Sequence, residues 1–200
     1  MDILAGLCLA ASAGLNAYLP LLILALAGRF GKLALPAPYH ALSEWLAIFI
    51  ILLPVTVELM LDKIPGWDSR NDRVATIIRP LAGALLFLAY NAARGEFVSP
   101  VVAGGLGLLA AAAVHALKMT TRPLVTLATR GYANALVSLL EDIVAAGVAV
   151  LAIFAPVVAA LLLLPALAAL YFLQVRLRPA AALARARLLQ KTVQAQQSQP

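Results

Sequence analysis

Long uncharged stretches constrain the fold of this chain more than any other feature. Residues 3–28 and 97–117 contain no Asp, Glu, Lys or Arg, and residues 143–175 form a run of 33 residues without a charge. A helix needs about 20 apolar residues to cross a bilayer. Charged residues make up 12% of the chain, whereas about 25% is typical of soluble domains. The sequence therefore predicts an all-α integral membrane protein.

Two further spans have to include charged residues. Only 13 residues separate Glu44 from Glu58, so a second span has to continue to about Leu61 and take Glu58 into or against the membrane. A third span, over residues 74–93, has to include Arg79. A long basic side chain near a span end can extend to the interface, and we expect Arg79 to do so.

The uncharged run over residues 143–175 is too long for one ordinary span and too short for two. A tight turn near Ala155-Pro156 divides it, provided that the fifth span begins at about Ala133 and includes Glu141 and Asp142. This division gives six transmembrane helices in one bundle over residues 1–175. A basic tail, residues 176–200, follows the bundle and ends in a Gln-rich segment, which predicts disorder.

The distribution of Lys and Arg supports six spans. The six-span topology places twelve of these residues on one side and three on the other, namely Arg29, Lys32 and Arg94. A five-span topology places seven on one side and eight on the other, which is almost no asymmetry. Since cytoplasmic loops carry the excess of Lys and Arg, the sequence predicts six spans with both termini in the cytoplasm.

A weak internal repeat divides the chain into two halves. Residues 6–17 align with residues 105–116, which places Asn16 opposite His115, and residues 20–28 align with residues 123–131. Two units of three spans, over about residues 3–93 and 98–175, would be inverted relative to each other. Many secondary transporters have this construction, with a binding site near the interface of the repeats.

Polar residues inside the predicted spans are the candidate site, because ionisable groups in a membrane are costly unless they are paired or functional. Asn134, Ser138 and Glu141 recur at the helical period, as do His115, Lys118 and Arg122, so each set can form a stripe that faces the bundle. The full set of candidate ion-binding or substrate-binding residues is Asn16, Glu58, Asp62, His115, Lys118, Arg122, Asn134, Ser138, Glu141 and Asp142.

These residues allow several chemical roles. Glu58 and Asp62 supply oxygen ligands suited to Mg²⁺ or Ca²⁺, or they accept a proton. We expect Lys118 and Arg122 to pair with Glu58, Asp62 or Glu141. His115 is either a proton relay or a hydrogen-bonding residue of helix packing. Asn16, which lies between Gly14 and Pro20, either marks a helix break whose free backbone groups bind an ion or makes an interhelical hydrogen bond.

Several separated motifs resemble those of a known family. They are Gly14-Leu-Asn-Ala-Tyr-Leu-Pro20, Glu58-x-x-x-Asp62-Lys-Ile-Pro-Gly-Trp-Asp68, Arg79-Pro-Leu-Ala-Gly83, His115-x-x-Lys118-x-x-x-Arg122 and Asn134-x-x-x-Ser138-x-x-Glu141-Asp142. Together they resemble a family of small bacterial multi-pass membrane proteins that is described as a domain of unknown function. Ala135 departs from that pattern, which has proline after the asparagine. The resemblance implies a bacterial inner membrane and carries no activity with it.

Three function classes fit this sequence. The first is a transporter or permease whose buried carboxylates bind a cation or proton. The second is an intramembrane enzyme acting on lipid phosphate. The acidic and Pro-Gly motifs within residues 58–70 weakly resemble the motifs of such enzymes. The third is a non-catalytic assembly protein. We expect no cofactor, since the sequence contains no P-loop or zinc signature. We also expect no nucleic-acid partner. The expected partners are the lipid bilayer, a small ion or solute, and a second copy of the chain in a homodimer.

Overall fold

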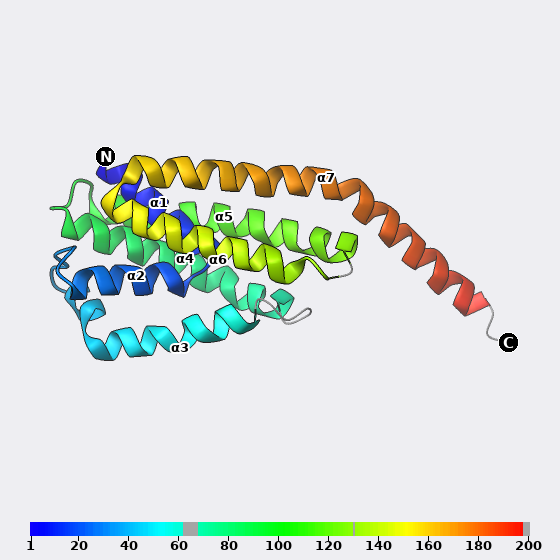
Figure 1. Ribbon diagram of the computed structural model, residues 1–200, viewed down its shortest axis with the longest axis horizontal. Helices are drawn as coiled ribbons and strands as arrows, with labels where there is room; N and C mark the ends of the chain where they lie inside the picture. The colour runs from blue at the N-terminus through cyan, green and yellow to red at the C-terminus, as the bar shows by residue number, and fades with distance from the viewer. Residues whose placement is uncertain (62–67, 130, 198–200) are drawn as a thin grey trace.

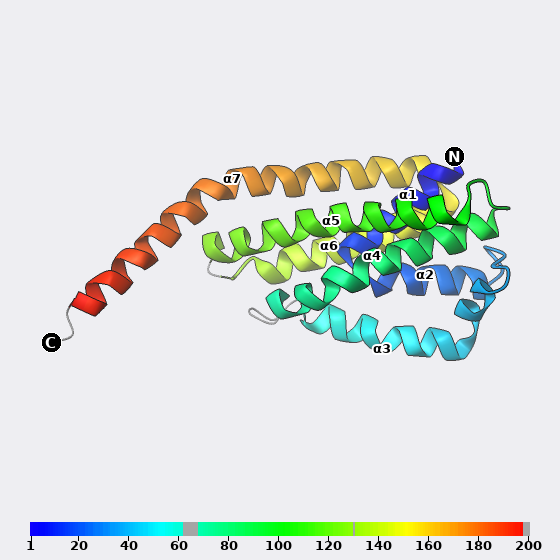
Figure 2. The same cartoon turned by 180° about the vertical axis from the view of Figure 1, so that it is seen from behind.

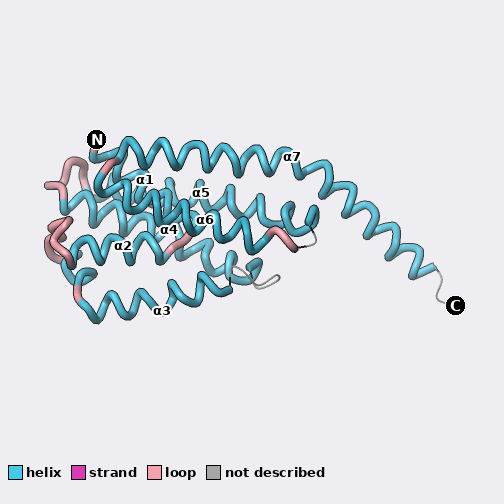
Figure 3. Tube along the Cα trace, in the orientation of Figure 1, coloured by secondary structure: helices cyan, strands magenta, loops and turns pink. Residues whose placement is uncertain are grey.

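The computed structural model describes residues 1–61, 68–129 and 131–197, and all regular secondary structure in these ranges is helical, with no strand. The described residues form seven α-helices and one short 3-10 helix, joined by loops (Figures 1 and 3). In chain order they are α1 (Asp2–Leu15), α2 (Tyr18–Arg29), η1 (Tyr39–Ser43), α3 (Trp45–Leu61), α4 (Asp68–Ala93), α5 (Pro100–Thr129), α6 (Asn134–Phe154) and α7 (Pro156–Gln197).

Four helices are long and apolar enough to cross a membrane, and the chain is therefore membrane-embedded. The four spans are Val74–Ala93 of α4, Pro100–Thr129, Asn134–Phe154 and Pro156–Pro179 of α7. They lie side by side and alternate in direction along the long axis of the molecule (Figures 1 and 2). The shorter apolar helix α3 lies next to α2 at one edge of the bundle.

The first apolar stretch does not cross the bundle. It forms α1 and α2, whose 14 and 12 residues correspond to about 21 Å and 18 Å of helix at 1.5 Å per residue. The chain turns back between them, so that α1 begins and α2 ends at the same end of the molecule (Figures 1 and 2). We call α1 and α2 the hairpin and Leu15–Tyr18 its tip. The prediction of a single span over residues 3–28 is wrong.

Proline and asparagine together explain the break. In a continuous helix, the ring of Pro20 would collide with the carbonyl group four residues earlier, which belongs to Asn16. Asn16 instead adopts an extended conformation, with φ −143° and ψ 124°. Its side-chain Oδ1 accepts hydrogen bonds from the backbone N–H groups of Tyr18 at 3.2 Å and Leu19 at 3.0 Å. The side chain thereby caps the start of α2, because the first N–H groups of a helix have no partner within it.

The hairpin also changes the predicted position of the N-terminus. The start of α1 and the end of α7 lie at opposite ends of the molecule (Figure 1), whereas the six-span prediction expects both termini on one side of a membrane. Each described loop nevertheless lies at the end of the molecule to which the six-span prediction assigned it (Figure 1). The reason is that residues 1–28 carry no Lys or Arg, so the charge count does not depend on where they lie.

Two other expectations differ from the structure. The segments aligned in the proposed repeat have different conformations, since the chain turns back before Pro20 but α5 continues through Pro123. Segments of Ala, Leu and Gly align readily without sharing a structure. The tail is helical as far as Gln197, where we expected disorder. Residues 180–197 are rich in Ala, Leu, Arg and Gln, which have high helix propensity.

The hairpin helix α1 lies in the middle of the bundle. Ten of its 14 residues are buried, and it packs against α4, α5, α6 and α7. A helix that is apolar on all sides is typically a core helix. The small side chains of α1 allow its neighbours to come close. Close packing also occurs where α4 crosses α5, since Gly107 packs against Phe87 and the backbone of Gly83.

The topology is tested by labelling single cysteines from each side of a liposome. In a Cys8→Ser background, we expect Ile3→Cys and Lys32→Cys to react with an impermeant maleimide from one side and Tyr132→Cys from the other. The physical reason is that the hairpin returns to the side on which it begins. Labelling of positions 3 and 132 from the same side would contradict the hairpin.

Helix packing at Gly107 is tested with a nearby glycine as control. We expect Gly107→Ala to lower the midpoint of thermal unfolding in detergent, since an added methyl group would collide with α4. Gly105→Ala has no atom within 4 Å of its new methyl group. It should be neutral or stabilising by up to about 1 kcal/mol, from helix propensity alone. Equal effects of the two substitutions would show that α4 and α5 do not pack closely at this point.

Candidate functional site

The two helix ends at the hairpin tip contact buried charges of opposite sign. Lys118 Nζ donates a hydrogen bond to the carbonyl oxygen of Leu15, at the end of α1, at 2.6 Å. The backbone N–H of Ala17, at the start of α2, donates to Glu58 Oε2 at 3.2 Å. A helix carries partial negative charge at its C-terminus and partial positive charge at its N-terminus. The cation and the carboxylate therefore each lie at the helix end that favours them.

Asp142 on α6 provides a third contact to the tip. Its Oδ1 accepts a hydrogen bond from Asn16 Nδ2 at 3.0 Å, and both side chains are buried. Asn16 therefore uses its amide oxygen to cap α2 and its amide nitrogen to hold the break against α6. The residue thus marks a helix break and also makes an interhelical hydrogen bond; the binding of an ion there stays a prediction.

Glu58 is the first member of a hydrogen-bonded series of polar side chains that includes residues of α4 and α5. Its Oε1 accepts a hydrogen bond from Arg79 Nη2 at 2.9 Å, and Arg79 Nη1 lies 3.0 Å from His115 Nδ1. On the other side of the ring, His115 Nε2 lies 3.1 Å from Thr76 Oγ1. Because a guanidinium group has no acceptor, Nδ1 has to accept from Arg79. The geometry thus assigns a neutral His115 that carries its proton on Nε2.

Arg79 does not extend to the interface as predicted. Its side chain is fully buried and paired with Glu58. The reason is that Glu58 enters the bundle on α3, where an unpaired carboxylate would cost more free energy than the burial of both partners.

A second group of charges joins α5 to α6. Glu141 Oε2 accepts from Arg122 Nη2 at 2.9 Å and lies 3.1 Å from Lys118 Nζ. All three residues are buried. Lys118 therefore links this group to the hairpin tip through Leu15. We call the eight buried residues that surround the tip the tip network: Asn16, Glu58, Arg79, His115, Lys118, Arg122, Glu141 and Asp142.

The tip network is balanced in charge. It contains three carboxylates, from Glu58, Glu141 and Asp142, and three basic side chains, from Arg79, Lys118 and Arg122, with His115 neutral. Within the described part of the chain, no group of three or more His, Cys, Asp or Glu residues is arranged to hold a metal ion. Each carboxylate of the tip network has a basic or amide partner.

The structure brings together seven of the ten predicted site residues. Lys118 and Arg122 both pair with Glu141 rather than with Glu58. Asn134 instead forms hydrogen bonds with Thr126 on α5, at 2.8 and 3.2 Å. Ser138 is fully buried, and its Oγ has no hydrogen-bond partner among the described residues. Asp62 lies outside the described residues.

Three participants were missed from the sequence. Arg79 was treated as an end-of-span residue, although a basic residue within a predicted span next to one that contains Glu58 indicates an ion pair. The other two are the backbone groups of Leu15 and Ala17, which become available only because the chain breaks there. The signal for the break was Pro20, four residues after Asn16.

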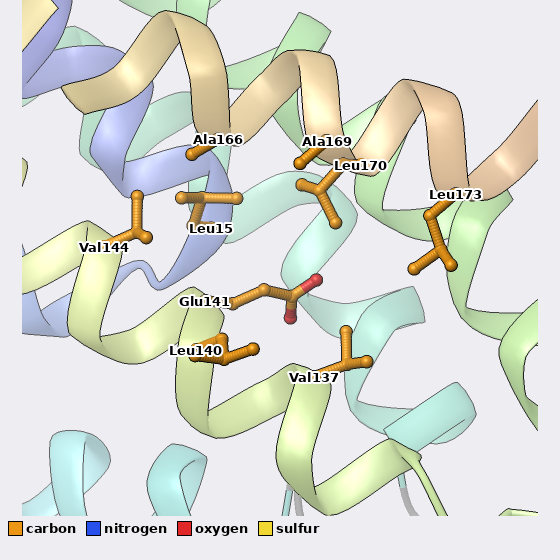
Figure 4. A pocket seen from close by; sticks show the side chains of 9 residues that line it. All are labelled: Leu15, Val137, Leu140, Glu141, Val144, Ala166, Ala169, Leu170 and Leu173. Atoms are coloured by element: carbon orange, nitrogen blue, oxygen red, sulfur yellow. The ribbon is translucent and has the colours of Figure 1, made fainter. Parts of the chain in front are cut away.

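A pocket of about 270 Å³ opens beside Glu141 (Figure 4). It is lined by Leu15, Val137, Leu140, Glu141, Val144, Ala166, Ala169, Leu170 and Leu173. The first of these residues belongs to the hairpin tip, and the others belong to α6 and α7. The pocket therefore adjoins the tip network directly.

Comparison with known proteins supports the resemblance that the motifs indicated. Residues 3–176 match a family described as "Domain of unknown function (DUF4126)". No curated protein and no solved structure matches the chain.

The buried and exposed ion pairs of this chain should differ strongly in stability. We expect Arg79→Gln to lower the free energy of unfolding by about 3–5 kcal/mol, because it leaves Glu58 buried without its cation. Arg94 pairs with Asp2 at the surface at 3.0 Å, and Arg94→Gln should cost less than about 1 kcal/mol. Reversible unfolding in mixed micelles measures both.

A double variant provides the control for this comparison. Glu58→Gln combined with Arg79→Gln should cost less than the sum of the single substitutions, since neither charge is then left alone. Additive costs would show that the two side chains do not interact.

Proposed function

The chain belongs to the family described as "Domain of unknown function (DUF4126)", and we propose that it is a permease-like membrane protein whose hairpin gates a polar site. The observation that carries the proposal is the broken helix. Its two ends meet Lys118 and Glu58 within the bundle, at 2.6 Å and 3.2 Å. In many transporters, helix ends of this kind form the binding site for substrate and coupling ions.

The contacts that hold the tip are suited to a movable element. The tip is held by three hydrogen bonds, from Lys118 to Leu15, from Ala17 to Glu58 and from Asn16 to Asp142. Neither hairpin helix crosses the bundle, so the tip can shift without drawing a complete span through the membrane. The six-span topology assigned twelve of the Lys and Arg residues to one side of the membrane, and such an excess supports a cytoplasmic position for that side.

A proton is the coupling ion that the network favours. When the tip moves away, Glu58 loses the N–H of Ala17 and Lys118 loses the carbonyl of Leu15. These two charged side chains of the tip network are then left without their backbone partners. A proton binds to a single carboxylate, such as that of Glu58 or Glu141, without the several oxygen ligands that a metal ion needs.

The alternative of an enzyme acting on lipid phosphate rests on residues 58–70. Asp62 and residues 65–67 of this segment lie outside the described residues, and no contact that we describe favours that chemistry. Ser69→Ala separates the two functions, because an enzyme of that type should lose turnover and a permease should not.

Flux through reconstituted protein tests the proposal. We expect proteoliposomes with an internal pH-sensitive dye to report proton movement when one class of solute is added from a panel of organic anions, amines and neutral hydroxyl compounds. Glu58→Gln and Glu141→Gln should reduce that signal at least tenfold, because neither amide can accept the proton. Arg94→Gln, which alters a surface pair, is the matched control.

A negative result in this assay would be informative. If neither the solutes nor an imposed pH gradient gives flux above protein-free liposomes, the permease function is wrong. The ion pairs would then set the register of the helices in an assembly protein.

A further inference from the structure

The pocket between α6 and α7 has an apolar wall with one polar group. Of its nine lining residues, all within the described part of the chain, eight are Leu, Val or Ala and one is Glu141. Figure 4 shows the Glu141 carboxylate extending from α6 into the space between the two helices. The volume, about 270 Å³, is just below the range of about 300–1,000 Å³ that is common for ligand pockets. A short apolar group with one polar end fits this lining.

The Glu141 carboxylate, which extends into this space, has one acceptor oxygen that no described residue uses. Its Oε2 is held by Lys118 and Arg122, whereas its Oε1 is buried and has no hydrogen-bond partner among the described residues. The residue is 4% exposed, so bulk water does not satisfy this oxygen. A buried acceptor without a partner is costly, and a donor in the pocket would remove that cost.

The neighbouring charges select the kind of donor. Two basic side chains lie within 3.1 Å of the other oxygen of this carboxylate. An ammonium group at Oε1 would be repelled by both, and an anionic group would be repelled by Glu141 itself. A neutral hydroxyl group can donate a hydrogen bond without either penalty.

The pocket is open to the apolar surface of the bundle. On α7, Leu161, Leu164 and Phe172 are exposed, and only 11% of the most apolar part of the span Pro156–Pro179 is buried inside the protein. In a membrane this surface faces lipid chains, so an apolar molecule can reach the pocket from within the bilayer.

We propose that this pocket binds a neutral amphiphile with one hydroxyl group, which donates a hydrogen bond to Glu141 Oε1 while its apolar part packs between α6 and α7. The site goes beyond the proposed function, because it requires binding and not transport. If the molecule is also carried across the membrane, it is the substrate class of the permease.

Photo-crosslinking in phosphatidylcholine liposomes tests the site. The probe is 1-decanol with a diazirine on its chain, and the matched probe is its methyl ether, which has the same chain and no donor. We expect the alcohol to label peptides of α6 and α7 at least five times more than the ether does. Equal labelling by the two probes would overturn the proposal and leave a pocket that takes any lipid chain.

Two substitutions on α7 provide a second readout. Ala166→Phe fills the pocket and should reduce alcohol labelling at least fivefold, whereas Ala168→Phe, an exposed position that does not line the pocket, should not. Unchanged labelling of Ala166→Phe would contradict the site. The comparison of alcohol and ether uses the native chain and is decisive even if Ala166→Phe does not fold.

The crosslinking assay is independent of the flux assay. Selective labelling without flux would leave the binding site valid and remove the permease function. Flux without selective labelling would do the reverse.

Discussion

The structure depends on one constraint, which is that backbone N–H and C=O groups within a membrane need partners from the protein. The break at Asn16 exposes such groups at the centre of the bundle. One is met by Lys118, another by Glu58 and two more by the side chain of Asn16 itself. Each charged partner then requires a counter-charge of its own, which Glu141 and Arg79 supply. The whole tip network follows from satisfying a single interruption of the chain.

The ion pairs of the tip network position the hairpin more than they stabilise the fold. A buried ion pair is weak evidence for stability, because the desolvation of both charges offsets their attraction. Apart from Asn16, the members of the tip network come from α3, α4, α5 and α6, and they meet around a hairpin that does not cross the bundle. Such an arrangement specifies the position of the hairpin by directional contacts rather than by apolar packing alone. Contacts of that kind can be exchanged for others, as the proposed gating requires.

Much of this fold can be predicted from the sequence. Length arithmetic correctly predicted the membrane class, the turn at Ala155-Pro156 and a fifth span that contains Glu141 and Asp142. Helical periodicity correctly predicted that His115, Lys118 and Arg122 share a buried face. The hairpin escaped prediction because an uncharged run of 26 residues satisfies the length of a span whether or not it crosses, and its lack of Lys and Arg removes the charge evidence. Pairing partners also escaped, since periodicity predicts which face a residue lies on and not which helix lies opposite.

The position of the hairpin in the sequence has a consequence for the order of biosynthesis. Domains form from the N-terminus during translation, and α1 and α2 leave the ribosome first. The side chains that hold the tip come from residues 58–142, so they do not exist when residues 1–29 reach the membrane. Until α6 is made, residues 3–28 are an uncharged stretch long enough to insert as an ordinary span. The hairpin is thus the first part of the bundle to be synthesised and among the last to acquire its final contacts.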